Sequence, residues 1–269
     1  MEDALKSLNY PQTVIDRIVV NPPKGYERKD DDILIFTEIR TNKEIGDYVI
    51  SGEFDFCLQG DLEDHKSTSV WKWIFSEGEA ATARDIISEG GDIGQLIESC
   101  PGIADYILQG SIYRWLNPDK VTGESVQINY IFTDHSKAAA LRDKKYPQQR
   151  IMSKKYPLIP NRQIDAWIKG RLNDITKLSA APQPTLPLCT EVELWAKAAV
   201  WKYYKDPTKQ SRSTKNFDNA DDANSRLIKD GNVGKVVHMP GQVKRCEFCK
   251  VAEVCEQAKA LEAEGRLIL

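Results

Sequence analysis

The sequence lacks any apolar run near the roughly 18 residues needed to span a membrane, and its Met-Glu-Asp start has neither the basic nor the apolar part of a signal peptide. It also lacks an excess of one charge: 37 basic and 40 acidic residues give a formal net charge of −3, so bulk charge does not indicate nucleic-acid binding. Low-complexity tracts and internal repeats are absent. With 41% hydrophobic residues, these features exclude a disordered or fibrous chain and predict a globular cytoplasmic protein without a membrane partner.

The length of 269 residues allows one large domain or two modest ones. A proline-rich stretch, Ala-Ala-Pro-Gln-Pro-Thr-Leu-Pro, lies within residues 179–187 and is typical of a linker. We therefore predict one domain over residues 1–178 and a smaller, cysteine-bearing region over residues 179–269.

Alternating apolar residues near the N-terminal end predict a three-stranded meander, with turns at 41–43 and 59–60 and strands over residues 33–40, 47–57 and 61–66. Helical spacing over 101–116 ends at Asn117-Pro118 and is followed by an alternating strand over 126–132. A second helix is expected to begin near Pro160-Asn161. The fold class is therefore α/β.

Two acidic residues and one lysine have a spacing that suits phosphodiester chemistry. Residues two apart on a strand share a face, so Asp64 and Lys66 project together while Glu63 and His65 point the other way. If the hairpin brings Asp55 to Asp64, the two carboxylates form a hard oxygen site for Mg²⁺ or Mn²⁺, and the ammonium can steady charge on a phosphate. Taken alone, a D-x-K pattern is equally typical of a half-exposed strand with alternating charges.

The surrounding motifs give this pattern its meaning. Gly52-Glu-Phe-Asp55 precedes Asp64-His-Lys66-Ser-Thr, and Gln109-Gly-Ser-Ile-Tyr113 follows on the expected helix. This order resembles the RecB-like branch of the PD-(D/E)XK nucleases, especially phage exonucleases. The resemblance implies a restriction-endonuclease-like core, which is a mixed sheet flanked by helices. It further implies a metal-dependent DNA exonuclease acting in viral recombination, replication or host-DNA breakdown, in the cytoplasm of the host cell.

The resemblance also implies roles for individual residues. Asp55 and Asp64 would hold the metal with the main-chain carbonyl of His65, and Lys66 would position the attacking water. Gln109 and Tyr113 would hold the DNA strand or brace the metal-site residues. The expected product carries a 5′-phosphate.

One element of the family pattern is missing. Family members usually carry a His or Glu as a further metal ligand on a helix before the meander, whereas this chain has no histidine before His65. Glu38 is the substitute that strand phase offers, although a glutamate exposed to solvent is the alternative reading of that position. Glu2 of an N-terminal helix is a second substitute.

Three cysteines form a C-x₂-C-x₅-C pattern, and a fourth lies near the linker; they are Cys246, Cys249, Cys255 and Cys189. One distant and three clustered thiols can complete a four-thiolate site. A single C-x-x-C knuckle favours a 4Fe–4S cluster over zinc, which stays the alternative. Cys189-Thr190 followed by Trp195 also resembles the iron–sulfur region of phage exonucleases. Cys57 and Cys100 are interpreted as buried apolar residues.

Residues 137–155 hold seven bases against one acid, interleaved with Tyr146 and Tyr156. Such a segment can follow phosphates and stack bases without reading sequence, although a solvated face is the alternative. The DNA-contacting residues predicted here are Lys144, Lys145, Arg150, Lys154 and Lys155. For the tryptophans at positions 71, 73, 195 and 201, core packing is expected.

The preferred function is an exonuclease whose partner is DNA, as a single strand or a duplex end, with a recombinase or single-strand-binding protein as a further partner. Its rival is a non-catalytic DNA-binding or recombination partner that keeps the fold and the cluster. A zinc-held interaction module is a third possibility, and it requires the D-x-K resemblance to be accidental.

Overall fold

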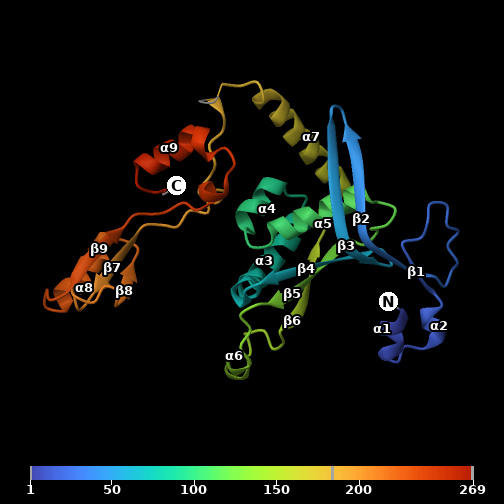
Figure 1. The fold of residues 1–269 in the computed structure, drawn as a ribbon, viewed down its shortest axis with the longest axis horizontal. Coiled ribbons are helices and arrows are strands. Elements are labelled where there is room, and N and C mark those ends of the chain that lie inside the picture. Colours follow the sequence, from blue (N-terminus) through green and yellow to red (C-terminus); the bar gives the residue numbers. More distant parts are fainter. Residues whose placement is uncertain (1, 183–184, 268–269) are drawn as a thin grey trace. The chain divides into compact units, whose positions relative to one another are not determined.

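The computed structural model describes residues 2–182 and 185–267. The chain divides into two compact units, Met1–Ile175 and Thr176–Leu269. Each unit is described by itself below (Figure 1).

The first unit is built on a six-stranded sheet with the order β1-β2-β3-β4-β5-β6. Two of the neighbouring pairs, β1 with β2 and β4 with β5, are parallel, and the other three are antiparallel. The strands are β1 (Ile18–Val20), β2 (Ile33–Ile45), β3 (Tyr48–Leu58), β4 (Asp61–Thr68), β5 (Ser125–Phe132) and β6 (Ile151–Pro157). The expected α/β class with a mixed sheet flanked by helices is confirmed at this level.

The β2–β3 hairpin is longer than the sequence pattern predicts. Thr41, Asn42 and Lys43, the predicted turn, lie inside β2 and pair with Gly52, Ser51 and Ile50. The hairpin instead turns between the paired Ile45 and Tyr48, where Gly46 has a φ of 57° that glycine adopts without strain. A polar, half-exposed hairpin end was misread as a turn because its residue types are those of turns.

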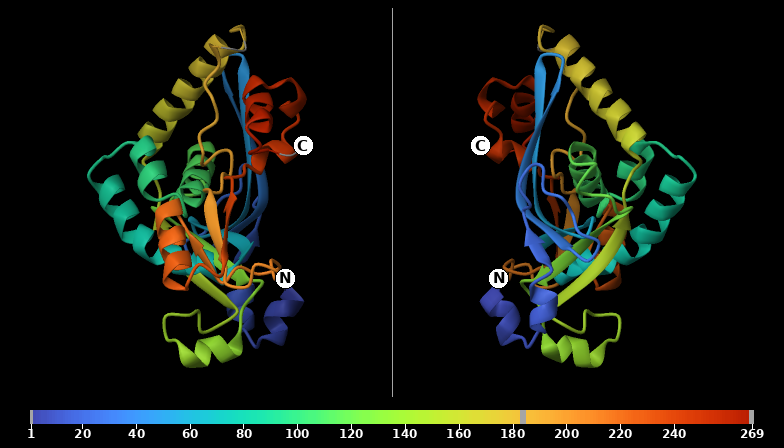
Figure 2. Two further views of the ribbon diagram at one scale, coloured as in Figure 1. Left: turned by 90° about the vertical axis from the view of Figure 1, so that its left-hand side faces the viewer. Right: turned by 90° about the vertical axis from the view of Figure 1, so that its right-hand side faces the viewer.

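Helices α3 (Val70–Ser88), α4 (Ile93–Ser99) and α5 (Ala104–Leu116) form the crossover from β4 to its parallel neighbour β5. Together with α7 (Asn161–Leu178), they bury their apolar residues against the sheet (Figures 1 and 2). Three short helices complete this unit, namely α1 (Glu2–Ser7), α2 (Gln12–Ile15) and α6 (Lys137–Arg142).

The core between sheet and helices is continuous and contains few polar groups. Phe54, Ile107 and Tyr130 are fully buried in it. The Tyr130 hydroxyl is satisfied by a hydrogen bond with the hydroxyl of Tyr156 at 2.7 Å. Cys57 and Cys100 are fully buried in the same core, as expected. This packing fixes β4 and α5 against one another, and those two elements carry the motif residues.

The second unit has a three-stranded antiparallel sheet with the order β8-β7-β9. The elements are β7 (Val200–Tyr204), β8 (Lys215–Phe217), α8 (Ala220–Lys229), β9 (Lys235–Met239), the 3₁₀ turns η2 (Arg245–Phe248) and η3 (Ala252–Val254), and α9 (Glu256–Ala263). Sequence periodicity did not predict this sheet, because its strands are short and lysine-rich.

The described helices include none with the length and apolar character that crossing a membrane requires.

Candidate active site

Four of the predicted site residues form one chain of polar contacts from β4 to α5. The Lys66 ammonium lies 2.8 Å from Oδ2 of Asp64 and donates a hydrogen bond to Oε1 of Gln109 at 2.9 Å. The side-chain amide of Gln109 in turn donates to the Tyr113 hydroxyl at 2.8 Å. Residues 43 positions apart in the sequence therefore contact each other directly, and Gln109 holds the ammonium in place.

The position of Gln109 follows from how α5 packs. Gln109 and Tyr113 lie one helical turn apart and share a face. The next residue, Gly110, lies so close to Val126 of β5 that an added Cβ would come within 3.0 Å of that side chain. Ser111 then accepts a hydrogen bond from the backbone N–H of Ile159 at 2.9 Å. A larger side chain at Gly110 would push α5 from the sheet and move Gln109 away from Lys66.

Asp55 lies where the pairing of β3 with β4 ends. The last paired residues are Phe56 and Glu63, and continuing that register by one residue sets Asp55 at the level of Asp64. From Asp64 onward, β4 has no described pairing with β3. A main-chain carbonyl on that edge, such as one that His65 directs there, is therefore not used in a hydrogen bond between β3 and β4. The register therefore sets Asp55 level with Asp64, as the hairpin prediction needs, while the meeting of their side chains stays a prediction.

The backbone of β3 changes phase at Asp55. Phe54, which packs 6.4 Å from the ring of Tyr113, and Cys57, which donates to the carbonyl of Lys120, both point toward the α5 side although they are three residues apart. Strict alternation would send them to opposite faces. The break coincides with Glu38 on β2, whose φ is 53°, and with the absence of Glu38 and Asp55 from the described β2–β3 pairs.

Electrostatics connect Asp55 to Asp64. Asp64 is 5% exposed, and burial raises the pKa of its carboxyl. The Lys66 ammonium lowers that pKa, while the negative charge of Asp55 raises it further. Oδ2 of Asp64 is closed to solvent and lies 2.8 Å from the Lys66 ammonium. As an oxygen donor the Asp64 carboxylate suits a hard cation, which would share it with that ammonium.

The opposite face of β4 is separate from this chain of contacts. Asn129 of β5 donates to the Glu63 carboxylate at 2.9 Å, and its side-chain nitrogen lies 3.5 Å from Nε2 of His65. Thus Asp64 and Lys66 share one face and Glu63 and His65 the other, as the two-residue alternation predicts.

Two residues beside the site were not recognised in the sequence as part of it. The ring centroid of Tyr106 lies 5.7 Å from the Lys66 ammonium and 5.1 Å from the Lys72 ammonium. Tyr106 falls within the helical spacing over residues 101–116, which indicates a core-facing residue and no role in a site. Lys72 lies in the first turn of α3, and its only sequence signal is that it closely follows the D-x-K strand.

Neither of the two glutamates suggested as the further metal ligand, Glu38 and Glu2, is placed at the site by the described residues. The side chain of Glu38 is exposed at the level of Asp55, on a left-handed backbone. The side chain of Glu2 lies outside the described residues. Across residues 2–182 and 185–267, three or more His, Cys, Asp or Glu side chains nowhere form a group that could hold a metal ion. Within those ranges, Asp55 and Asp64 are thus not joined by a third acidic or histidine side chain.

Most of the basic residues predicted to contact DNA are exposed. Lys144, Lys145 and Arg150 lie on the connection between α6 and β6, and Lys155 projects to solvent 3.9 Å from the carboxylate of Asp61. These four remain available to a polyanion.

Lys154 is different because its ammonium is used inside the protein. Its side chain is 13% exposed, and the ammonium donates at 2.9 Å to both the carbonyl of Trp73 and the hydroxyl of Ser76. It also pairs with Glu77 at 2.6 Å and lies 3.9 Å above the ring of Trp73. Burial lowers its pKa. Lys154 therefore ties β6 to α3, and we omit it from the proposed DNA contacts.

The four clustered cysteines are neighbours in the second unit. Burial raises the pKa of Cys246 and of Cys189, and in both cases the thiols of the neighbouring cysteines add to the shift. Cys246 is buried in a small core with Leu194, Val243 and Leu261, whereas Cys189 and Cys249 are exposed. Four thiolates are by their chemistry a suitable donor set for an iron–sulfur cluster or zinc. In the described part of the chain, however, these thiols do not converge into a metal-binding group.

Main-chain pairing explains how Cys189 reaches the other three. The segment entering the β7–β9 sheet pairs with the segment leaving it, through Lys197 with Gln242 and through the carbonyl of Leu194 with the N–H of Lys244. The side-chain amide of Gln257 on α9 then binds both the N–H and the carbonyl of Cys189 at 2.9 Å. The intervening sheet is thus an insertion closed at its base.

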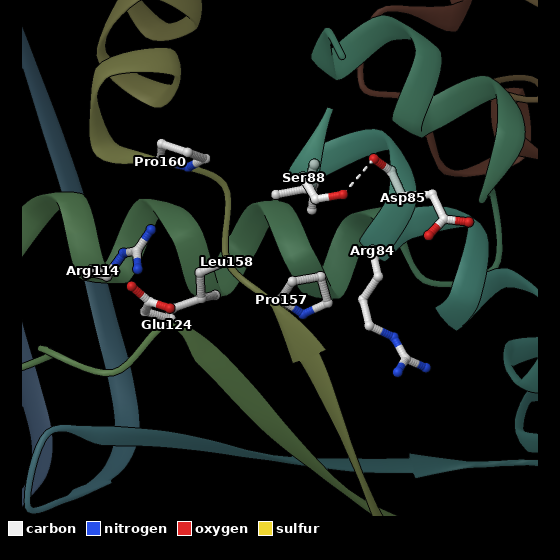
Figure 3. A pocket seen from close by; sticks show the side chains of 9 residues that line it. Arg84, Asp85, Ser88, Arg114, Glu124, Pro157, Leu158 and Pro160 are labelled. Atoms are coloured by element: carbon white, nitrogen blue, oxygen red, sulfur yellow. Dashed lines mark hydrogen bonds between the residues drawn. The ribbon is translucent and has the colours of Figure 1, made fainter. Parts of the chain in front are cut away.

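A pocket of about 520 Å³ lies elsewhere in the first unit, where α3 ends, β5 begins and β6 leads into α7 (Figure 3). Its lining includes Arg84, Arg114 and Glu124 and none of the predicted site residues. The Arg114 guanidinium donates to the carbonyls of Gly123 and Ile159, which holds two connections together. We interpret this pocket as a consequence of how these connections pack, and we assign it no ligand.

No family model, curated protein or solved structure matches this chain. The residues just described, and their chemistry, are therefore the basis for assigning a function.

Proposed function

We propose that the protein is a metal-dependent DNA exonuclease of the RecB-like PD-(D/E)XK type. The observation that carries the proposal is the chain of contacts Asp64–Lys66–Gln109–Tyr113, with Asp55 close enough to raise the pKa of Asp64. A buried carboxylate, an ammonium and a second carboxylate at the end of a strand pair are the groups that phosphodiester hydrolysis uses.

In this mechanism Asp55, Asp64 and the carbonyl of His65 would hold Mg²⁺ or Mn²⁺. When bound, the ion would supply positive charge that acidifies water and offsets charge on the phosphate. Lys66 orients the attacking water and places an ammonium beside the scissile phosphate, and Gln109 keeps that ammonium from swinging toward solvent. The oxygen of water bonds to phosphorus and loses a proton to solvent, while the bond from phosphorus to the 3′ oxygen breaks and that oxygen takes up a proton from solvent. The products are a 3′ hydroxyl and a 5′-phosphate.

The substrate is DNA, as a single strand or a duplex end, and the exposed cations Lys144, Lys145, Arg150 and Lys155 supply sequence-independent contacts. We place the activity in viral DNA recombination, replication or host-DNA degradation, in the host cytoplasm. A recombinase or single-strand-binding protein is the matching protein partner. The four cysteines of the second unit hold a 4Fe–4S cluster, or zinc in its place, and this group has a structural role.

The test is cleavage of end-labelled single-stranded and duplex DNA with Mg²⁺ or Mn²⁺. The wild-type protein should release nucleotides, whereas Asp64→Ala and Lys66→Ala should still bind DNA without cutting it. Lys209→Ala, which removes an exposed lysine of the second unit that is not among the proposed DNA contacts, is the control and should retain cleavage. If wild-type protein that binds DNA releases no nucleotide with either ion, the nuclease assignment is wrong.

A second function is favoured by one specific observation. Among the described residues, no third acidic or histidine side chain joins Asp55 and Asp64. A chain that lost this ligand would become a non-catalytic DNA-binding or recombination partner that keeps the fold. The same assay distinguishes the two, since that partner binds DNA and leaves it intact.

A further inference from the structure

Two aromatic rings on α3 are exposed, one of them a tryptophan for which the sequence predicts burial. Trp71 and Phe75 are each 64% exposed, one helical turn apart, and their ring centroids lie 6.0 Å apart with an angle of 31° between the planes. Ile74, between them on the helix surface, is 37% exposed. Trp73 faces the core, whereas the expectation of core packing is wrong for Trp71 and also for Trp195, which is 51% exposed. We call Trp71 and Phe75 the aromatic pair.

The aromatic pair lies on the helix turn that borders the candidate active site. Lys72, the residue after Trp71, directs its ammonium to the same Tyr106 ring that the Lys66 ammonium approaches. The start of α3 is fixed, because the N–H of Val70 donates to the side chain of Asp134 at 2.8 Å. The segment that connects Lys66 to the aromatic pair is therefore short, and its end at Val70 is held in place.

On the other side of the aromatic pair, the neighbouring Ile74 lines a pocket that includes two lysines. Ile74 lines a pocket of about 620 Å³ together with Lys144 and Lys145, two of the exposed lysines on the connection before β6. The carboxylate of Glu77 also lines it, but that group is paired with Lys154. Exposed rings thus lie between a lysine-lined pocket and the lysines of the candidate site.

We infer that the aromatic pair stacks on the bases of single-stranded DNA and leads the strand between this pocket and Asp64. Flat rings bind the faces of unpaired bases of any sequence, while the flanking ammonium groups of Lys72, Lys144 and Lys145 match the charge of the phosphates. Duplex DNA keeps its bases stacked on one another and gains nothing from these rings. An apolar partner protein would not need three cations around the contact. This inference rests on the proposed function, since it names the substrate form that the same site takes.

The test uses substitutions that separate stacking from apolarity. In EDTA, where no cleavage occurs, Trp71→Leu with Phe75→Leu should weaken binding of a single-stranded oligonucleotide by tenfold or more. Trp71→Phe should bind within about twofold of wild type, because it keeps an aromatic face. Blunt duplex of the same length should bind all of these variants and the wild type alike. Ile175→Ala, which removes another exposed apolar residue from a helix surface, is the control for a general effect and should change nothing.

Three results would overturn the inference. If the variant with leucine at positions 71 and 75 binds the single strand as tightly as wild type, the surface is an apolar contact for another macromolecule. If duplex binding falls as much as single-strand binding, the rings have no role in stacking. If the wild type is an active nuclease and the leucine variants bind and cleave single strands as well as it does, the stacking role of the aromatic pair is wrong while the proposed function stands. If the wild type cuts no DNA but the variants show the expected binding pattern, the stacking role of the aromatic pair is supported and the nuclease assignment is wrong.

Discussion

At the scale of single residues, the candidate site depends on Gln109, which links the Lys66 ammonium to the Tyr113 hydroxyl. A hydrogen bond to a charged group contributes about 1.5–3 kcal/mol, more than one between neutral groups. We expect Gln109→Leu to lower the cleavage rate by roughly 10- to 100-fold while DNA binding in EDTA stays within a few-fold. Single-turnover cleavage beside equilibrium binding measures both effects.

Tyr113→Phe is the graded control, because the hydroxyl contributes through Gln109 only. Its cleavage rate should fall less than that of Gln109→Leu, by about tenfold at most, as expected for a neutral hydrogen bond. If Tyr113→Phe abolished cleavage as Lys66→Ala should, the tyrosine would contact the substrate directly, and its role as a support would be wrong.

Asp32 links pH to the stability of the first unit. Its carboxylate accepts hydrogen bonds from the Tyr26 hydroxyl and the N–H of Lys29, both at 2.8 Å. The backbone hydrogen bond from Lys29, followed by the Tyr26 hydroxyl, lowers the pKa of Asp32 below its ordinary value of 3.8. A lowered pKa stabilises the fold above the unfolded-state pKa, and the contribution is lost as pH falls through the folded-state pKa. We expect wild type to exceed Asp32→Asn in urea midpoint at pH 6 to 7, and the gap to close below about pH 4. A gap that widens in acid would contradict this.

At the scale of elements, the sequence predicted those strands and helices that have a clear periodicity and a clear boundary. The β2–β3–β4 meander, α5 and α7 follow from alternation, from helical spacing and from prolines at their ends. The contacts of Asp64 with Lys66 and of Gln109 with Tyr113 follow from spacing within one element. The contact of Lys66 with Gln109 joins two elements and could be anticipated only from the motif order.

Other elements could not be predicted, for identifiable reasons. The first two turns of α3 carry Trp71, Trp73, Ile74 and Phe75 on both the inner and outer sides, so no single apolar stripe marks a helix there. In β6 the pair Lys154-Lys155 appears as a charge run, although one lysine points into the protein and the other into solvent. The phase change at Asp55 coincides with the left-handed backbone of Glu38, and neither residue type predicts it.

The attachment of β6 to α3 gives a stability prediction at this scale. Lys154→Ala removes the donor that serves the Trp73 carbonyl and the Ser76 hydroxyl, together with the cation above the Trp73 ring. We expect a loss of about 1–3 kcal/mol in the free energy of unfolding, measured by urea denaturation. Lys155→Ala, next to it and exposed, should change that free energy by less than about 0.5 kcal/mol. Equal effects of the two substitutions would show that the buried contacts of Lys154 contribute nothing.

At the scale of the whole molecule, a net charge of −3 conceals the basic stretch over residues 137–155, which holds seven bases against one acid. If Lys144 and Lys145 contact phosphates, their replacement by alanine together should weaken DNA binding equally for unrelated sequences. The slope of log affinity against log salt should also become shallower by about 0.7 per lost contact on a single strand. Lys209→Ala with Arg212→Ala, two bases of the second unit, serves as the comparison for charge loss alone. An unchanged slope for the Lys144 and Lys145 variant would identify that stretch as a solvated surface.

The division into two units predicts that the cysteine cluster stabilises one of them only. Cys189 reaches Cys246 through main-chain pairing and the Gln257 amide, with little apolar burial beyond the small core around Leu194 and Leu261. A bound cluster or zinc ion would therefore supply much of the stability of this region. We expect Cys249→Ala to lower the bound iron or zinc and acid-labile sulfide, and to open residues 185–267 to proteolysis. The first unit should keep its protease resistance, because its core contains none of these cysteines. Cys100→Ala is the matched control: it removes a thiol buried in the first unit and should leave the metal content unchanged. A Cys249→Ala protein with full metal content, or one whose first unit is lost together with the second, would contradict the assignment of this group as a local structural clasp.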